Sequence, residues 1–255
     1  MQADSKEIRM VMAVGAYGNL ADLEVLGRFA KENDCVVILD NAPAFGSTFR
    51  GKHSWQYGFS EMISFHATKV FNSMEGGANI VNDPEIADYL LRLRDFGQYE
   101  KTRGDVDIPG LNSKMLEVSA LVGLRNLTKV DFILKSRARN AERYRELFGR
   151  LEAQGMLRTM EVHEDVHCPY LYFPVILHEE ATAFVRHMQE REIAVRRYYT
   201  ATHDLRFYRG RYREQDLSYT NAIKDNIVSL PLHTVMSDDE IEYLFSSVRS
   251  YFSKD

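Results

Sequence analysis

Short apolar runs alternate with amphipathic segments along the first half of the chain. Residues 9–14 and 35–39 are mostly apolar and have the length of buried strands, and the helical pattern between them begins at Asp22, a residue type that caps helices. Strand, helix and strand in this order predict a βαβ unit, and therefore a parallel sheet with helices over its faces. Residues 61–65 and 78–81 are predicted as further strands of the same sheet.

The pattern changes in the second half. Residues 113–152 keep helical spacing of apolar positions without a proline, which predicts one long helix or two helices end to end. Shorter elements follow, with predicted strands at 170–177, 193–199 and 226–230, a helix at 179–191, and a last helix opened by the capping box Ser237–Glu240. We therefore expect a partial large α/β domain over residues 1–130 and a small α+β domain over residues 131–255.

Composition narrows the class of protein. The 255 residues are 45% hydrophobic and 27% charged, with a net charge of −5, which excludes a disordered or fibrous chain. No apolar run approaches the roughly 20 residues that cross a bilayer. Two cysteines, Cys35 and Cys168, have neither disulfide-framework nor zinc-site spacing. The sequence predicts a soluble, cytoplasmic protein with no metal, no membrane partner and no nucleic-acid partner.

Lys69 and Asp40 are the candidate chemical pair. Each comes at or just after the end of a predicted strand, where parallel sheets place their ligand sites. A lysine among apolar neighbours loses hydration, its pKa falls, and its amine becomes a nucleophile toward an aldehyde. A carboxylate that holds a pyridinium nitrogen completes the protein side of pyridoxal phosphate chemistry. From the residues alone, a surface lysine and an aspartate that caps a turn are the competing interpretation.

Several blocks of the sequence resemble one known family. Residues 64–69 (SFHATK) followed by 75–77 (EGG) are similar to the signature of the DegT/DnrJ/EryC1/StrS family of pyridoxal-phosphate-dependent sugar aminotransferases. Further blocks resemble that family in its order, at 14–19 (VGAYGN), 39–46 (LDNAPAFG), 110–117 (GLNSKMLE), 195–199 (VRRYY) and 229–233 (SLPLH). The resemblance covers nearly the whole chain and implies the aspartate-aminotransferase-like fold, fold type I.

The resemblance also implies roles for single residues. Lys69 matches the lysine that forms the Schiff base with pyridoxal 5'-phosphate and carries the proton between cofactor and sugar carbon. Asp40 matches the acid that keeps the ring nitrogen protonated, and Ser64 matches a hydroxyl that binds the phosphate. Asn112 matches an asparagine that reaches the phosphate in the neighbouring subunit, so a homodimer with shared active sites is expected.

The implied reaction converts a nucleotide-linked keto-deoxysugar to an amino sugar, with glutamate as the amino donor. A basic, aromatic stretch at residues 196–213 has the cations and ring faces that a nucleotide sugar needs, and Tyr198 and His203 are its first candidate substrate-binding residues. Taken without the resemblance, the same stretch fits single-stranded nucleic acid. Relatives that dehydrate their sugar typically carry histidine in place of the lysine, so Lys69 favours transamination.

Three departures from the family pattern affect these expectations. Pro43 stands where members usually carry histidine or glutamine near the cofactor ring, and Gly15 where they tend to carry histidine. Members also extend further at the amino end, so this chain is expected to be a fragment or a shortened member. The alternative function is therefore a truncated, catalytically incompetent homologue that acts as a dimerising or interaction protein.

Overall fold

The computed structural model describes residues 8–98, 104–211 and 217–253, and its first half is built on a four-stranded sheet in the order β1-β2-β5-β6. Three parallel strands come first, β1 (Met10–Val14), β2 (Val36–Asp40) and β5 (Ser60–Ser64). The fourth, β6 (Gly77–Ile80), runs antiparallel to β5, which corrects the expectation of a wholly parallel sheet. No helix lies in the segment from 65 to 76, all of which the structure describes, so β5 and β6 are not joined by the helical crossover that a parallel connection uses.

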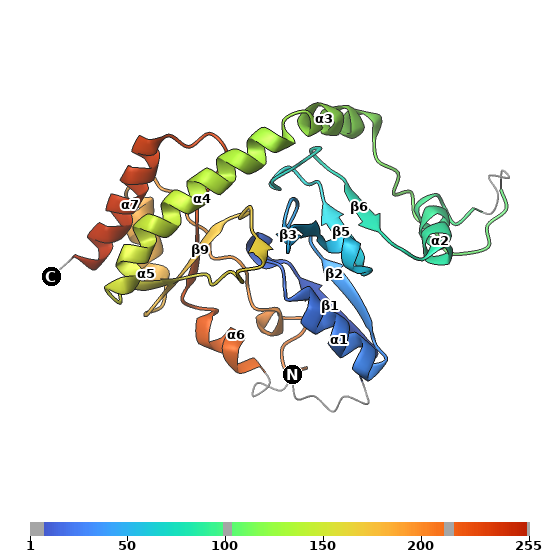
Figure 1. Cartoon of the computed structure of the whole chain (residues 1–255), viewed down its shortest axis with the longest axis horizontal. Helices are drawn as coiled ribbons and strands as arrows, with labels where there is room; N and C mark the ends of the chain where they lie inside the picture. Colours follow the sequence, from blue (N-terminus) through green and yellow to red (C-terminus); the bar gives the residue numbers. More distant parts are fainter. Residues whose placement is uncertain (1–7, 99–103, 212–216, 254–255) are drawn as a thin grey trace. The chain divides into compact units, whose positions relative to one another are not determined.

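The two helices next to this sheet each begin after an aspartate cap. The Asp22 carboxylate accepts hydrogen bonds from the Glu24 and Val25 amides, both at 2.9 Å, and opens α1 (Leu23–Asn33). Figure 1 shows α1 beside β1 and β2. Pro84 is the first residue of α2 (Pro84–Arg94), capped by Asp83. The remaining short elements are η2 (Ala16–Gly18), η3 (Ser54–Tyr57) and a second sheet of β4 (Lys52–His53), β3 (Thr48–Phe49) and β8 (Val166–His167).

The long helical stretch is two helices, α3 (Glu117–Leu127) and α4 (Val130–Ala153). On α3 the predicted apolar stripe faces outward, since Val118, Leu121 and Leu124 are each more than 60% exposed. Its small residues Ser119 and Gly123 are buried instead. The hydrophobic pattern therefore located the helix but not a core face within this chain.

The chain divides into two compact units, and the division falls within α4. The first unit comprises Met1–Leu134 and His163–Leu171, and the second comprises Lys135–Val162 and Tyr172–Asp255. The domain border expected after residue 130 stays a prediction.

The second unit is built on the antiparallel sheet β10-β9-β7. Its core is aromatic: Tyr144, Phe148 and Phe173 are all at most 1% exposed, and their ring centroids lie 5.2–5.8 Å apart. The elements of this unit are β7 (Leu157–Thr159), β9 (Phe173–Leu177), β10 (Ile227–Leu230), α5 (Thr182–Gln189), η4 (Thr202–Asp204), α6 (Ser218–Ile223) and α7 (Asp238–Phe252).

Two expectations for this unit have opposite outcomes. The capping box is confirmed, because Ser237 Oγ accepts from the Glu240 amide at 3.2 Å while Glu240 accepts from the Ser237 amide at 2.8 Å. The strand predicted at 193–199 is wrong: only Arg196 forms a bridge, with Ser229. Ile193 and Val195 are buried while Ala194 and Arg196 are exposed, so this alternation reflects partial burial of an irregular segment and not a ladder.

No helix in the described ranges has both the length and the apolar character needed to span a bilayer.

Candidate active site

The ends of the three parallel strands meet at one edge of the main sheet. Val14 pairs with Asp40, and Asp40 pairs with Met62, two residues before β5 ends at Ser64. The Gly15 amide donates to the Asp40 carbonyl at 2.9 Å and ties the first two ends together. The topology therefore brings Gly15, Asp40 and Ser64 to the edge at which parallel sheets bind ligands.

Asp40 is the last residue of β2 and is half-buried. Its Oδ1 accepts a hydrogen bond from the Ala42 amide at 3.1 Å, and the Ala44 amide donates to the Asn41 carbonyl at 2.8 Å. Pro43 lies within this tight turn, where its fixed φ suits the backbone. These hydrogen bonds fix the backbone that follows Asp40.

Lys69 lies on a turn that follows β5. Its amide donates to the His66 carbonyl at 2.9 Å, and the Thr68 amide donates to His66 Nδ1 at 3.3 Å. Val70 and Phe71, which come next, are buried. The turn is therefore anchored at both ends, and the lysine side chain stays half-buried between them.

The surroundings of Lys69 act on its amine in two directions. Burial lowers the pKa of Lys69 from its ordinary value of 10.5, because the ammonium form loses hydration. The negative charge of Asp40 raises it again and is the weaker effect. Lys69 and Asp40, 29 positions apart in the sequence, are thus close enough to interact electrostatically.

Ser64 ends β5, and its Oγ accepts a hydrogen bond from the His66 amide at 3.3 Å. The hydroxyl is thereby held at the start of the Lys69 turn. Opposite it, Gly77 pairs with Ser64 across the β5–β6 ladder. A Cβ on Gly77 would lie 2.7 Å from the Ile63 carbonyl oxygen, so the glycine permits the close approach of this neighbouring strand.

Asn112 lies on a different part of the first unit. It forms a backbone bridge with Asp95 just after α2, and its side chain is exposed. Within the described residues it makes no side-chain hydrogen bond. Its assignment as a cofactor-binding residue stays a prediction.

Tyr198 and His203 belong to the second unit. The Tyr198 ring lies 5.2 Å from the rings of both Tyr172 and Tyr199, and burial together with the neighbouring Tyr198 raises the pKa of Tyr172. His203 is nearly covered and its Nε2 lies 2.8 Å from Asn221 Oδ1. The last two residues of the basic stretch, Tyr212 and Arg213, lie outside the described residues.

Comparison with known proteins identifies the family. A sequence profile of the DegT/DnrJ/EryC1/StrS aminotransferase family matches residues 3–249, which is nearly the whole chain. The chain belongs to this family.

Two curated relatives illustrate the similarity. The chain is 29% identical to dTDP-4-amino-4,6-dideoxy-D-glucose transaminase of Shigella dysenteriae over 97% of its own length and 68% of that protein. It is 27% identical to GDP-perosamine synthase of Vibrio cholerae over 98% of its own length and, again, 68% of the relative. The chain thus spans about two thirds of the length of these aminotransferases.

Solved structures show the same fold. The sugar aminotransferase CalS13 of Micromonospora echinospora superposes with a TM-score of 0.86 at 22% identity, over 96% of this chain and 69% of that one. The PLP form of a protein described as a sugar aminotransferase in Streptococcus pneumoniae gives 0.89 at 22% identity, over 99% and 70%. These likenesses confirm the expected fold type I architecture.

Pyridoxal phosphate is the cofactor of this aminotransferase family, and the chemistry of the strand-end residues fits it. An amine with a lowered pKa, a carboxylate near it and a hydroxyl on the adjoining strand end are the groups that an aldehyde, a pyridinium nitrogen and a phosphate require. In the described ranges, no three His, Cys, Asp or Glu side chains lie together as a metal site would need.

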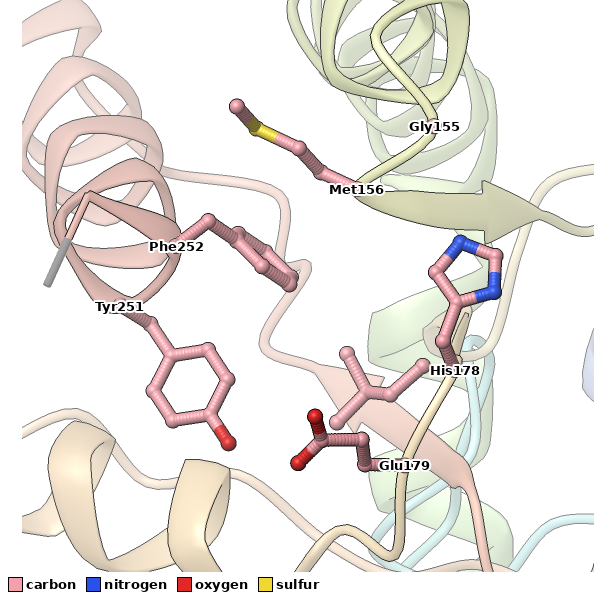
Figure 2. A pocket seen from close by; sticks show the side chains of 7 residues that line it. Gly155, Met156, His178, Glu179, Tyr251 and Phe252 are labelled. Carbon is pink, nitrogen blue, oxygen red and sulfur yellow. The ribbon is translucent and has the colours of Figure 1, made fainter. Parts of the chain in front are cut away.

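A separate pocket of about 380 Å³ lies within the second unit, and Figure 2 shows its side chains. The Glu179 carboxylate and the Tyr251 hydroxyl lie on one side of it, and burial and the Glu179 charge raise the pKa of Tyr251. None of the six predicted site residues is among those that line it, which are Gly155, Met156, Leu177, His178, Glu179, Tyr251 and Phe252.

One buried polar cluster beside Asp40 was missed from the sequence. Asn41, Ser54 and Glu61 are joined by side-chain hydrogen bonds and are at most 4% exposed. They are separated by up to 20 positions and match no motif. The one signal in the sequence was that successive residues of a strand point to opposite faces, which turns Asn41 away from Asp40.

Proposed function

We propose that this chain carries out pyridoxal-phosphate-dependent transamination of a nucleotide-linked keto-deoxysugar, with glutamate as the amino donor. The observation that carries the proposal is the electrostatic pair of Lys69 and Asp40 at the carboxyl edge of the main sheet. Family membership supports the chemistry, and the names of the two curated relatives support a sugar linked to dTDP or GDP.

In this proposal Lys69 is the catalytic residue. Its lowered pKa increases the fraction of neutral amine at a given pH, and only the neutral amine can attack an aldehyde carbon or accept a proton at Nζ. The turn anchored at His66 holds Nζ at the sheet edge, so the same atom can take the proton from one carbon and return it to another.

Asp40 and Ser64 hold the cofactor. The Asp40 carboxylate, oriented by the Ala42 amide, keeps a proton on the ring nitrogen, and the Ser64 hydroxyl binds the phosphate. When bound, pyridoxal phosphate supplies the electron sink that stabilises a carbanion next to the reacting nitrogen. Pro43 has no side-chain hydrogen-bond donor to offer the ring.

The proposal assigns the remaining cofactor contact to a second copy of the chain. Asn112 is exposed and makes no side-chain hydrogen bond within the described residues, which fits a residue that reaches the phosphate in a neighbouring subunit. A homodimer would also cover apolar surface, since α3 exposes Leu121 and the groove beside β6 and α2 is lined by Ile80, Leu90 and Leu111.

Tyr198 and His203 are proposed to contact the nucleotide sugar. Tyr198 lies in a cluster of three tyrosine rings whose faces can stack on a nucleotide base. Arg196 and Arg197, which directly precede it in the sequence, add two cations that can pair with the diphosphate. The proposal includes a cytoplasmic location, which fits a chain whose two cysteines lack the spacing of a disulfide framework.

A second candidate function rests on the exposed apolar face of α3. A chain that spans about two thirds of its relatives and presents this face fits a catalytically incompetent homologue that dimerises or binds a partner. It predicts self-association without cofactor binding, whereas the enzyme predicts both.

Absorption spectroscopy separates the two functions. The purified chain is titrated with pyridoxal phosphate, and the enzyme is expected to develop a saturable visible band that Lys69→Ala abolishes. Lys114→Ala serves as the matched control, because Lys114 is a lysine of the same unit that pairs with Asp95 instead. Absence of a saturable band in the parent chain, or the same band in Lys69→Ala, would contradict the proposed function.

A further inference from the structure

Three buried polar side chains form a hydrogen-bonded series beside the end of β2, the strand that carries Asp40. Asn41 Nδ2 donates to Ser54 Oγ at 3.0 Å, and Ser54 Oγ donates to Glu61 Oε2 at 2.7 Å. The three residues are 2%, 4% and 4% exposed. Each hydrogen bond in this series is donated toward the next residue, and the last acceptor is the Glu61 carboxylate. The Ser54 hydroxyl and the Asn41 amide therefore each have one favoured orientation.

The three residues come from three elements that surround the Asp40 turn. Asn41 directly follows β2, Ser54 opens η3, and Glu61 lies within β5. The Asn41 amide also donates to the Met62 carbonyl of β5 at 2.9 Å. Both the backbone and the side chain of Asn41 are thus attached to the strand that leads to Lys69.

Close packing fixes Asn41 from the opposite direction. A Cβ built on Gly15 would lie 2.6 Å from Asn41 Oδ1 and 2.8 Å from the Ala44 Cβ. The absence of a side chain at Gly15 therefore makes the space that the Asn41 amide occupies. Held between Gly15 and Ser54, Asn41 has little freedom, and Asp40 is its immediate neighbour in the chain.

We propose that Asn41, Ser54 and Glu61 are positioning residues, which fix the turn after β2 and thereby direct the Asp40 carboxylate toward Lys69. They act through Asp40, and none of them needs to contact cofactor or substrate. Their importance to cofactor chemistry rests on the proposed function, but their effect on Asp40 exists in the chain without any ligand.

The ligand-free effect gives the test. The purified chain is pulse-labelled with acetic anhydride over a series of pH values, and mass spectrometry of peptides gives the labelling rate of Lys69 as a function of pH. Lys31, exposed on α1, is the internal reference. In Asp40→Asn the midpoint for Lys69 is expected to move to lower pH, because the opposing negative charge is gone.

Ser54→Ala removes the link between Asn41 and Glu61 and is expected to shift the Lys69 midpoint in the same direction as Asp40→Asn. Ser60→Ala is the matched control, because Ser60 is the neighbour of Glu61 on β5 and makes no side-chain hydrogen bond within the described residues. Glu61→Gln keeps an acceptor oxygen for Ser54 and is expected to retain the parent midpoint, which a general loss of folding would not do.

A Ser54→Ala midpoint equal to that of the parent chain, with Asp40→Asn shifted, would overturn the proposal. So would an Asp40→Asn midpoint that does not move, because Asp40 would then not reach Lys69. Both outcomes are read without cofactor, and they are therefore distinguishable from failure of the proposed function, which is read from cofactor absorption.

Discussion

The strand-end site is packed so closely that Gly15 has no room for even one additional methyl group. Gly15→Ala would place a methyl group 2.6 Å from Asn41 Oδ1, against a side chain that is already held by Ser54. We expect the free energy of unfolding to fall by about 1–3 kcal/mol, as overpacking of a buried site does. Urea denaturation followed by circular dichroism measures the change.

Gly27→Ala is the matched control for Gly15→Ala. Gly27 lies in α1, and a Cβ there would meet only Phe59 Cζ at 3.7 Å, an ordinary contact. This substitution is expected to raise the free energy of unfolding by about 0.5–1 kcal/mol, because alanine favours a helix over glycine. Equal effects of the two substitutions would contradict the packing described around Asn41.

The same residue scale sets the pH dependence of Lys69. Burial lowers the folded-state pKa below 10.5, so at neutral pH the unfolded chain holds that proton more tightly and the charged lysine destabilises the fold. Lys69→Met removes this penalty, and the variant is expected to be more stable than the parent at pH 7. The difference should shrink as the pH rises through the lowered folded-state pKa and level off above 10.5, where the amine is neutral in both states.

Urea unfolding of parent and Lys69→Met at several pH values checks the sign of this effect. Lys31→Met, at an exposed position of α1, controls for the general effect of replacing a lysine. A stability difference between parent and Lys69→Met that stays constant with pH would show that burial does not act on the Lys69 amine.

At the scale of elements, local signals predicted what local forces decide. Asp22 and Ser237 begin helices where their caps indicated, and the apolar runs before Gly15 and Asp40 are strands. The direction of β6 was not predictable from its own residues, because it depends on whether the connection from β5 forms a helical crossover. The segment 193–199 was mistaken for a strand because burial alone produces the same alternation.

The same contrast between local signals and long-range contacts applies to the prediction of the site residues. Lys69 and Asp40 were found because each follows a strand and their residue types fit one chemistry. The Asn41–Ser54–Glu61 cluster was not found, since its contacts join residues that share no spacing rule and form only once η3 packs beside β5. The outward stripe on α3 was found as a helix, but a sequence pattern does not say whether its partner surface belongs to the same chain.

The exposed stripe on α3 yields a prediction of its own. Leu121 and Leu124 are 65% and 62% exposed, so changing both to glutamine removes little buried area within the chain. The free energy of unfolding is expected to change by no more than about 0.5 kcal/mol. If the stripe contributes to the proposed dimer, self-association should weaken, which sedimentation velocity at several concentrations measures.

Arg125→Gln is the matched control, because Arg125 is an exposed polar residue on the same helix. Its self-association should equal that of the parent chain. Undiminished association in the Leu121→Gln, Leu124→Gln variant would exclude α3 from the interface, and a large loss of stability would show that the stripe packs within its own chain.

At the scale of the molecule, a family fold is retained over about two thirds of the length of its relatives. The first unit holds Lys69, Asp40 and Ser64 at one sheet edge, and the second holds Tyr198 and His203. The proposed enzyme needs the first group to bind cofactor in the chain as it stands, whereas a catalytically incompetent homologue does not.

Borohydride reduction tests this claim most directly. The chain is incubated with pyridoxal phosphate, reduced, digested and mapped by mass spectrometry. The account predicts that the parent chain carries one phosphopyridoxyl group per molecule, located on Lys69. In Asp40→Asn the yield of that modified Lys69 peptide is expected to fall markedly or to zero. No modified peptide, or modification spread over exposed lysines such as Lys31 and Lys114 with Lys69 unmodified, would contradict it.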